Sequence, residues 1–209
     1  MEARRAWKRV PPWGVLGAGL IAVAGGCSAR PAVANLDSRG SAIICFGNSL
    51  TKGEGASTGR DYPSLLATTL GREVINAGVS GETTRDALRR LEADVLAKDP
   101  RLVIVEFGGD DFLQQLGRKE TFANLDTIVR RIQARGAMVV PVGVPSGLLG
   151  DAARGEYRKI ARTRRAAFVP NILDGILTHP QLKSDELHPN DLGYEKIAQR
   201  IAQAVEPLL

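Results

Sequence analysis

The chain has 209 residues, of which 44% are hydrophobic and 24% are charged. This composition is typical of one ordinary globular domain and excludes a disordered or fibrous chain. The formal net charge is +5, but four basic side chains and one acidic side chain lie in the first 26 residues, and the rest of the chain carries 24 basic and 22 acidic residues. A remaining net charge of +2 gives nucleic-acid binding little electrostatic support, so we expect no nucleic-acid partner.

The N-terminal segment is predicted to direct export. The basic run RRAWKR precedes the apolar stretch WGVLGAGLIAVAGG, which is shorter than the roughly 20 apolar residues of a membrane-spanning helix. Two processing sites fit. AVAGGC resembles a bacterial lipobox ending at Cys27, which would carry the lipid, although Ala24 stands where leucine is usual. PAVAN offers an ordinary cleavage site after Ala34. We therefore expect an exported protein, either a cell-envelope lipoprotein or a periplasmic or secreted one.

These signals divide the chain into a signal peptide of lipoprotein type at residues 1–27, a tether at 28–40 and one domain at 41–209. Cys45 is the only other cysteine and lies inside an apolar run. If Cys27 is lipidated or removed, no disulfide can form within the chain. Cys45 is thus predicted to be a small buried hydrophobic residue.

Short apolar runs alternate with helical patterns after residue 40. The runs predicted to be strands buried on both faces are SAIICF (41–46), REVINA (72–77), RLVIVEF (101–107), AMVVPVGV (137–144) and AAFVP (166–170). The helical patterns cover residues 62–71, 83–98, 121–136, 155–165 and 190–209. This alternation predicts an α/β fold, a three-layer α/β/α sandwich around a five-stranded parallel sheet.

Glycine-rich loops follow the first three predicted strands. They read GNSLTKGEG, GVSGETT and GGDDFL, and a fourth polar segment, SDELHPND, lies near the C-terminus. Ligand sites of such sheets lie beyond the carboxyl ends of the strands. These loops are therefore the predicted functional region.

Ser49, in the first of these loops, is a candidate nucleophile. A serine hydroxyl needs a nearby base, and that base needs a carboxylate to set its tautomer. His188 is one of two histidines in the chain, and Asp185 precedes it by three residues. Alone, Ser49 could be a helix cap and His188 a surface histidine. Together they are compatible with a catalytic triad, provided that the fold brings the two ends of the chain together.

The four segments FGNSLTKG, NAGVSGETT, EFGGDDFL and SDELHPN resemble, in order and spacing, the sequence blocks of the SGNH, or GDSL-type, hydrolases. They are similar above all to the small bacterial lysophospholipases, thioesterases and arylesterases, and the resemblance spans residues 41 to 206. It implies a flavodoxin-like three-layer fold and ester hydrolysis with neither a metal nor an organic cofactor. By position, it implies Ser49 as nucleophile, Asp185 and His188 as the other triad members, and the N–H groups of Ser49 and Gly81 as oxyanion-hole donors.

Two positions depart from the family pattern. Asn48 stands where the family has the aspartate of G-D-S, and Asp110 stands where an asparagine side chain donates a third hydrogen bond to the oxyanion. An ionised carboxylate cannot donate, and loss of one such donor lowers turnover by roughly 10²–10³. We hypothesise a linked exchange in which Asn48 supplies the amide that Asp110 lacks. The alternative is that Asp110 stays protonated beside Asp111.

The predicted function is that of a serine esterase acting on a small-molecule acyl ester: a lysophospholipid, an aryl ester or a thioester. A carbohydrate deacetylase is an alternative on the same fold. The rival from another class is a catalytically impaired envelope lipoprotein that binds acyl ligands, and Asn48 and Asp110 favour it. We expect a monomer, tethered to a membrane through Cys27 if that residue is lipidated. We expect no metal at the GGDD segment, because the side chains of adjacent aspartates point in different directions.

Overall fold

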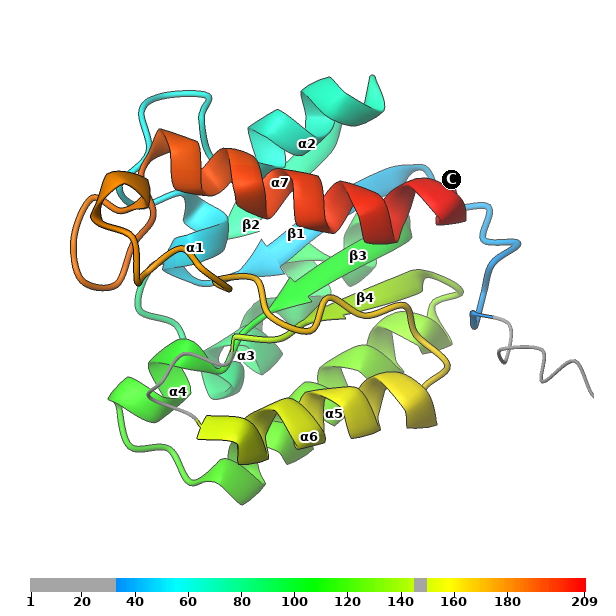
Figure 1. Ribbon diagram of the computed structural model, residues 1–209. Coiled ribbons are helices and arrows are strands. Elements are labelled where there is room, and N and C mark those ends of the chain that lie inside the picture. The colour runs from blue at the N-terminus through cyan, green and yellow to red at the C-terminus, as the bar shows by residue number, and fades with distance from the viewer. Residues whose placement is uncertain (1–32, 145–149) are drawn as a thin grey trace, which may run out of the picture. The chain divides into compact units, whose positions relative to one another are not determined.

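The computed structural model describes residues 33–144 and 150–209, so the expected signal peptide, Cys27 and the first part of the expected tether lie outside the described residues. The centre of the fold is a parallel sheet with the strand order β2-β1-β3-β4 (Figure 1). Its strands are β1 (Ala42–Gly47), β2 (Val74–Gly78), β3 (Pro100–Glu106) and β4 (Met138–Val142).

Helices cover both faces of the sheet (Figure 1). One face carries α2 (Tyr62–Leu70) and α7 (Asp191–Val205), and the other carries α3 (Thr84–Asp94), α5 (Arg118–Ala134) and α6 (Gly150–Thr163). The shorter helices are α1 (Ser49–Lys52) and α4 (Gly109–Leu113), with 3₁₀ turns η1 (Leu96–Lys98), η2 (Pro180–Leu182) and η3 (Glu206–Leu208). The predicted three-layer α/β fold is confirmed. A search of the described helices finds no segment that combines the length and the apolarity needed to cross a membrane.

The expected fifth strand, residues 166–170, is reduced to one isolated bridge. Val169 pairs in parallel with Val142 at the open edge of β4, and the Val169 carbonyl accepts a hydrogen bond from the Gly143 N–H at 2.8 Å. The ladder goes no further, because the Gly143 carbonyl accepts its hydrogen bond from the Ile172 N–H at 3.0 Å and not from residue 171, as a parallel register would require. The described sheet therefore has four strands and a short extension beside β4.

Each central strand contributes side chains to two cores. In β1, Ile43 and Cys45 pack on the side of α2 and α7, whereas Ile44 and Phe46 pack on the side of α3, α5 and α6. Successive side chains of a strand point to opposite faces, so a strand that is covered on both faces has a continuous apolar sequence. This is why the runs in the sequence predicted the strand positions. The expectation of burial on both faces is wrong for β2, which lies at the edge of the sheet and is only partly buried.

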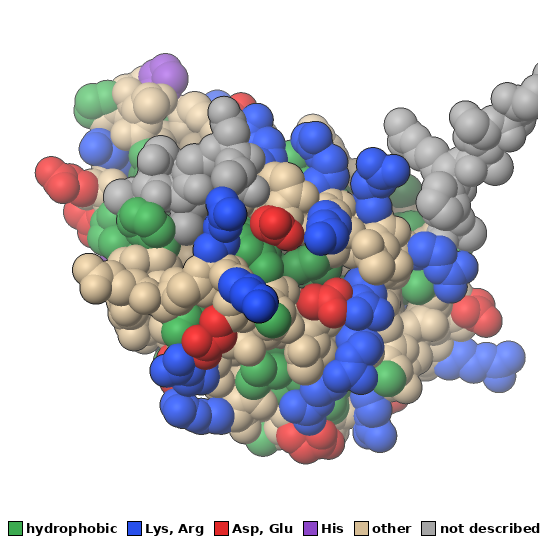
Figure 2. All heavy atoms as spheres, turned by 90° about the horizontal axis from the view of Figure 1, so that it is seen from below, with side chains coloured by type: hydrophobic (Ala, Val, Ile, Leu, Met, Phe, Trp, Pro, Cys, Tyr) green, Lys and Arg blue, Asp and Glu red, His purple; other side chains and the backbone are tan. Residues whose placement is uncertain are grey.

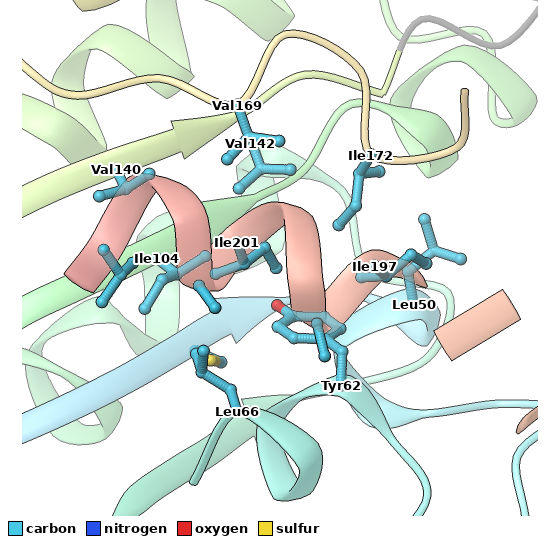
Figure 3. Packing of buried hydrophobic residues seen from close by; sticks show 14 of the residues in the cluster. Leu50, Tyr62, Leu66, Ile104, Val140, Val142, Val169, Ile172, Ile197 and Ile201 are labelled. Atoms are coloured by element: carbon cyan, nitrogen blue, oxygen red, sulfur yellow. The ribbon is translucent and has the colours of Figure 1, made fainter. Parts of the chain in front are cut away.

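The first of these cores joins the two ends of the domain. Figure 3 shows Tyr62 and Leu66 of α2 close to Ile197 and Ile201 of α7. All four side chains are fully buried, and burying one such side chain stabilises a fold by about 1.5–3 kcal/mol. The packing of α2 on α7 holds the segment after β1 against the C-terminal segment.

Residues 33–40 contact the body of the domain. The Asn35 side chain donates hydrogen bonds to the carbonyls of Gln133 and Ala137 at 2.8 and 2.9 Å, and Val33 packs against the first core. The packed chain thus includes residues that precede the expected boundary at residue 41.

Candidate active site

Ser49 is presented by a tight turn at the end of β1. The turn passes through Gly47, where a Cβ atom would collide with the Thr51 side chain and approach Glu106. Asn48 then caps α1, because its Oδ1 accepts a hydrogen bond from the Leu50 N–H at 3.2 Å. Ser49 is the first residue of α1, and an N–H at that position has no acceptor within the helix. The turn therefore leaves both the hydroxyl and the N–H of Ser49 available.

The loop that precedes α7 is shaped around Asp185. One carboxylate oxygen, Oδ1, accepts hydrogen bonds from the N–H groups of Leu187 and His188 at 2.7 and 2.8 Å. The other, Oδ2, lies 2.9 Å from His188 Nδ1. The hydrogen bond with His188, followed by the one from the Leu187 N–H, lowers the pKa of Asp185 to about 2. Asp185 is thus ionised at neutral pH and holds the imidazole ring of His188 by one nitrogen.

The other ring nitrogen of His188 reaches the serine. His188 Nε2 lies 3.1 Å from Ser49 Oγ, across 139 positions of sequence. Two contacts between the first loop and α7 support this approach: the Tyr194 hydroxyl donates to the Glu54 carbonyl at 2.8 Å, and the Ser57 N–H donates to Asp191 at 2.7 Å. Since Nδ1 faces a carboxylate, a neutral imidazole would carry its proton there and leave Nε2 as an acceptor for the serine proton.

Gly81 lies in the loop after β2 and lines the same cleft as Ser49. Its backbone has a φ of +78°, which favours glycine, and its carbonyl accepts a hydrogen bond from Gln114 Nε2 at 2.6 Å. In residues 33–144 and 150–209, no acceptor is found for the N–H of Gly81 or for that of Ser49. Sequence reasoning did not single out Gln114, the side chain that orients this peptide.

The loop with Gly81 leads directly into α3, and Asp111 anchors the start of that helix. The buried Asp111 carboxylate accepts hydrogen bonds from both the N–H and the hydroxyl of Thr84. Asp111 therefore has a role in holding two loops together. Among the described residues, no cluster of three or more side chains suited to holding a metal is found.

Asn48 and Asp110 lie close together beside the serine. Burial, and then the charge of Asp111, raises the pKa of Asp110, while His188 and a hydrogen bond with the Asn48 side chain oppose the rise. The Asn48 side chain is buried, and its oxygen is already engaged by Leu50. Its amide nitrogen is consequently the group that can donate toward Asp110.

Glu106 is a second residue that sequence reasoning missed. It ends β3, is fully buried, and its Oε2 accepts hydrogen bonds from the Thr51 hydroxyl at 3.0 Å and the Asn48 N–H at 3.4 Å. Burial raises its pKa to about 8, so the carboxyl group is largely neutral at pH 7. The signal in the sequence was a glutamate inside the otherwise apolar run RLVIVEF. Glu106 ties the turn that presents Ser49 to the neighbouring strand.

A cleft of about 300 Å³ lies beside Ser49 and His188. Its polar lining includes Asn48, Ser49, Gly81, Asp110 and His188, and its apolar lining consists of Leu50, Leu113, Val144, Leu173, Leu177 and Leu187. Pockets for small molecules combine an apolar lining with a few polar groups in this way. A larger hollow, of about 500 Å³, lies between α5 and α6 and is lined by none of the predicted site residues.

Comparison with known proteins gives a consistent result. The family model of the GDSL-like lipase/acylhydrolase family matches residues 45–196. An arylesterase of Vibrio mimicus is 31% identical over 172 residues, which cover 77% of this chain and 86% of that protein. The Escherichia coli protein named thioesterase 1/protease 1/lysophospholipase L1 is 28% identical over 175 residues, covering 80% of this chain and 84% of that protein. Among solved structures, AlinE4, described as an SGNH-hydrolase family esterase, is 33% identical with a TM-score of 0.63 and covers 81% of this chain and 97% of its own. The chain therefore belongs to the GDSL-like lipase/acylhydrolase family and is an SGNH-type hydrolase.

Proposed function

We propose that this protein is a serine esterase that hydrolyses acyl esters through an acyl-enzyme. Ser49 is the nucleophile, His188 the general base and Asp185 the carboxylate that orients the imidazole ring. The observation that carries the proposal is the continuous hydrogen-bonded line from Asp185 through both ring nitrogens of His188 to Ser49 Oγ. A serine in such a line is activated because its proton has an acceptor at hydrogen-bond distance.

The reaction would proceed in two halves. Ser49 Oγ attacks the acyl carbonyl carbon as its proton passes to His188 Nε2, and the imidazolium then donates that proton to the departing alcohol or thiol. Water next attacks the acyl-enzyme and gives a proton to the same nitrogen. Collapse of the second intermediate releases the carboxylic acid and restores Ser49. The ionised Asp185 stabilises the imidazolium in both halves.

The negative oxygen of each tetrahedral intermediate needs donors. We assign the N–H groups of Ser49 and Gly81, which line one cleft and have no acceptor among the described residues. Asn48 and Asp110 line the same cleft beside Ser49, which supports the linked exchange, in which Asn48 supplies the side-chain amide that Asp110 lacks. Ester turnover of Asp110→Asn, alone and combined with Asn48→Asp, tests this exchange. If the single change raises turnover as much as the double change, the two positions are not linked.

The substrate is proposed to be a lysophospholipid, an aryl ester or an acyl thioester. The leucine side chains in the cleft suit an acyl chain, and the relatives above are named as an arylesterase and a thioesterase/lysophospholipase. The proposal includes export, with lipid attached at Cys27, which lies outside the described residues. The second candidate is a non-catalytic acyl-binding lipoprotein, favoured by the Asp110 carboxyl group beside the serine.

A fluorophosphonate probe separates the two candidates, because it reacts covalently with an activated serine. We expect labelling of the wild-type protein and of Ser57→Ala, a control in the same loop, and none of Ser49→Ala. Absence of labelling in folded wild-type protein would favour the non-catalytic binder. Turnover of p-nitrophenyl esters of increasing chain length would then define the acyl preference of the active protein.

A further inference from the structure

The outer surface of α5 and α6 is strongly basic. Figure 2 views the molecule from this side and shows Lys and Arg side chains outnumbering acidic ones. Six exposed cations on these two helices form no ion pair with any described residue. They are Arg118, Lys119, Arg130, Arg158, Lys159 and Arg162. The acidic side chains Glu120 and Asp126 of α5 are both neutralised, by Arg85 and Arg164.

A groove runs between these helices, with a volume of about 500 Å³. Arg118, Lys119 and Lys159 stand along it and outnumber Glu156, its one acidic lining residue without an ion pair among the described residues. Phe122 and Ile160 supply apolar side chains to the lining. This combination suits a phospholipid, because the cations can bind its phosphate and the apolar side chains can contact the hydrocarbon that is joined to it. Free phosphate, a strongly hydrated anion, would contact only the cations and not the apolar side chains.

Helix α4 lies between the basic groove and the catalytic cleft. Arg118 also lines an adjoining hollow together with Phe112 of α4. Phe112 and Leu113 are adjacent and 41% and 49% exposed, and Leu113 lines the cleft that holds Ser49. Exposed apolar side chains thus lie between the cationic groove and the cleft.

We propose that the α4–α5–α6 surface docks on an anionic phospholipid surface. We choose this partner for its charge. A cluster of cations is attracted to an anionic lipid surface when the two are within about a Debye length of each other, even on a domain of low net charge. Nucleic acid is disfavoured because the groove lining offers apolar side chains where a sugar–phosphate backbone needs polar partners. Docking in this orientation places the mouth of the cleft beside the lipid. The proposal does not depend on the catalytic roles assigned above.

The test measures co-sedimentation of the full chain with vesicles of phosphatidylcholine alone and of an equimolar mixture with phosphatidylglycerol. Cys27→Ser is present throughout, so that no attached lipid contributes. We expect binding to favour the anionic vesicles and to weaken as salt is added. The triple variant Lys119→Glu/Arg158→Glu/Lys159→Glu is expected to bind the anionic vesicles at least about a hundredfold less tightly, since each of the three lost cations contributes severalfold and the new carboxylates are repelled by the surface.

The matched control reverses three exposed cations elsewhere, Arg72→Glu/Lys98→Glu/Lys196→Glu, and carries the same basic N-terminal segment. Thermal unfolding establishes that both variants fold. If the two triple variants lose affinity equally, net charge rather than this surface drives binding, and the proposal is wrong. The proposal is also wrong if a DNA duplex binds the protein as tightly as the anionic vesicles do and if the Lys119→Glu/Arg158→Glu/Lys159→Glu variant loses that DNA binding. Because vesicle binding needs no ester turnover, its outcome is separate from that of the proposed function.

Discussion

Replacing Glu106 by glutamine is expected to make the protein increasingly more stable than wild type as pH rises. The wild-type carboxyl group is fully buried under the turn that presents Ser49, and its Oε1 has no hydrogen-bond partner among the described residues. Glutamine has the same shape and can still accept from the Thr51 hydroxyl and the Asn48 N–H through its single oxygen. It differs in that it cannot ionise.

The magnitude follows from proton linkage. Burial raises the pKa of Glu106 from its ordinary value of 4.5 to about 8. Between these two values the unfolded chain releases the proton and the folded chain keeps it, so the unfolded state binds fewer protons and stability falls as pH rises. Below pH 4.5 both states are protonated, and above pH 8 both are ionised, so the stability change is confined to this window. One pKa unit corresponds to about 1.4 kcal/mol, which gives a total of about 5 kcal/mol, of which about 3 kcal/mol falls between pH 5.5 and 8.5.

Urea unfolding of both proteins at about pH 5.5 and 8.5 measures this effect, because other titrating groups cancel in the difference between variant and wild type. The stability difference should change by about 3 kcal/mol in favour of glutamine at the higher pH. Glu73→Gln, at an exposed position, is the control. A difference for Glu106→Gln that is the same at both pH values would refute the reasoning, since it would mean that Glu106 is ionised throughout.

Three further outcomes are expected. Asp185→Asn should lower ester turnover by roughly 10⁴-fold in a soluble-ester assay, because an amide favours the wrong tautomer of His188. Leu66→Ala should lower the free energy of unfolding in urea by about 2–5 kcal/mol, because Leu66 is fully buried between α2 and α7. Asp111→Ala should lower it by about 1–3 kcal/mol, because it removes the acceptor for two groups of Thr84. Unchanged turnover for Asp185→Asn would contradict the role of Asp185 in orienting His188. An unchanged free energy of unfolding for Leu66→Ala or Asp111→Ala would contradict the stabilising role of the corresponding side chain.

The strands were predictable because their signal is local. The apolar runs around Ile44, Ile104 and Val140 belong to β1, β3 and β4, which are covered on both faces. The run at 166–170 is also apolar but forms only one bridge, because the Gly143 carbonyl pairs with the Ile172 N–H and not with residue 171. Apolar composition predicts burial, whereas backbone hydrogen bonding decides whether a buried segment is a strand.

The gathering of the candidate site residues at one edge of the sheet was predictable. Ser49, Gly81 and Asp110 each follow a strand, and parallel strands end at a common edge. Glu106 and Gln114 escaped prediction because their roles are defined by partners far along the chain: the Thr51 hydroxyl for one and the Gly81 carbonyl for the other. A single sequence does not reveal such pairs.

By itself, the sequence determined the alternation of strands and helices and the glycine-rich loops at the carboxyl ends of the strands. It also supplied Ser49, Asp185 and His188, whose side chains are of the types that form a catalytic triad. Only the tertiary structure decided that His188 Nε2 lies 3.1 Å from Ser49 Oγ. The physical reason is that hydrophobic periodicity is a property of neighbouring residues. The distance between two loops 139 positions apart depends instead on how α2 and α7 pack on one face of the sheet.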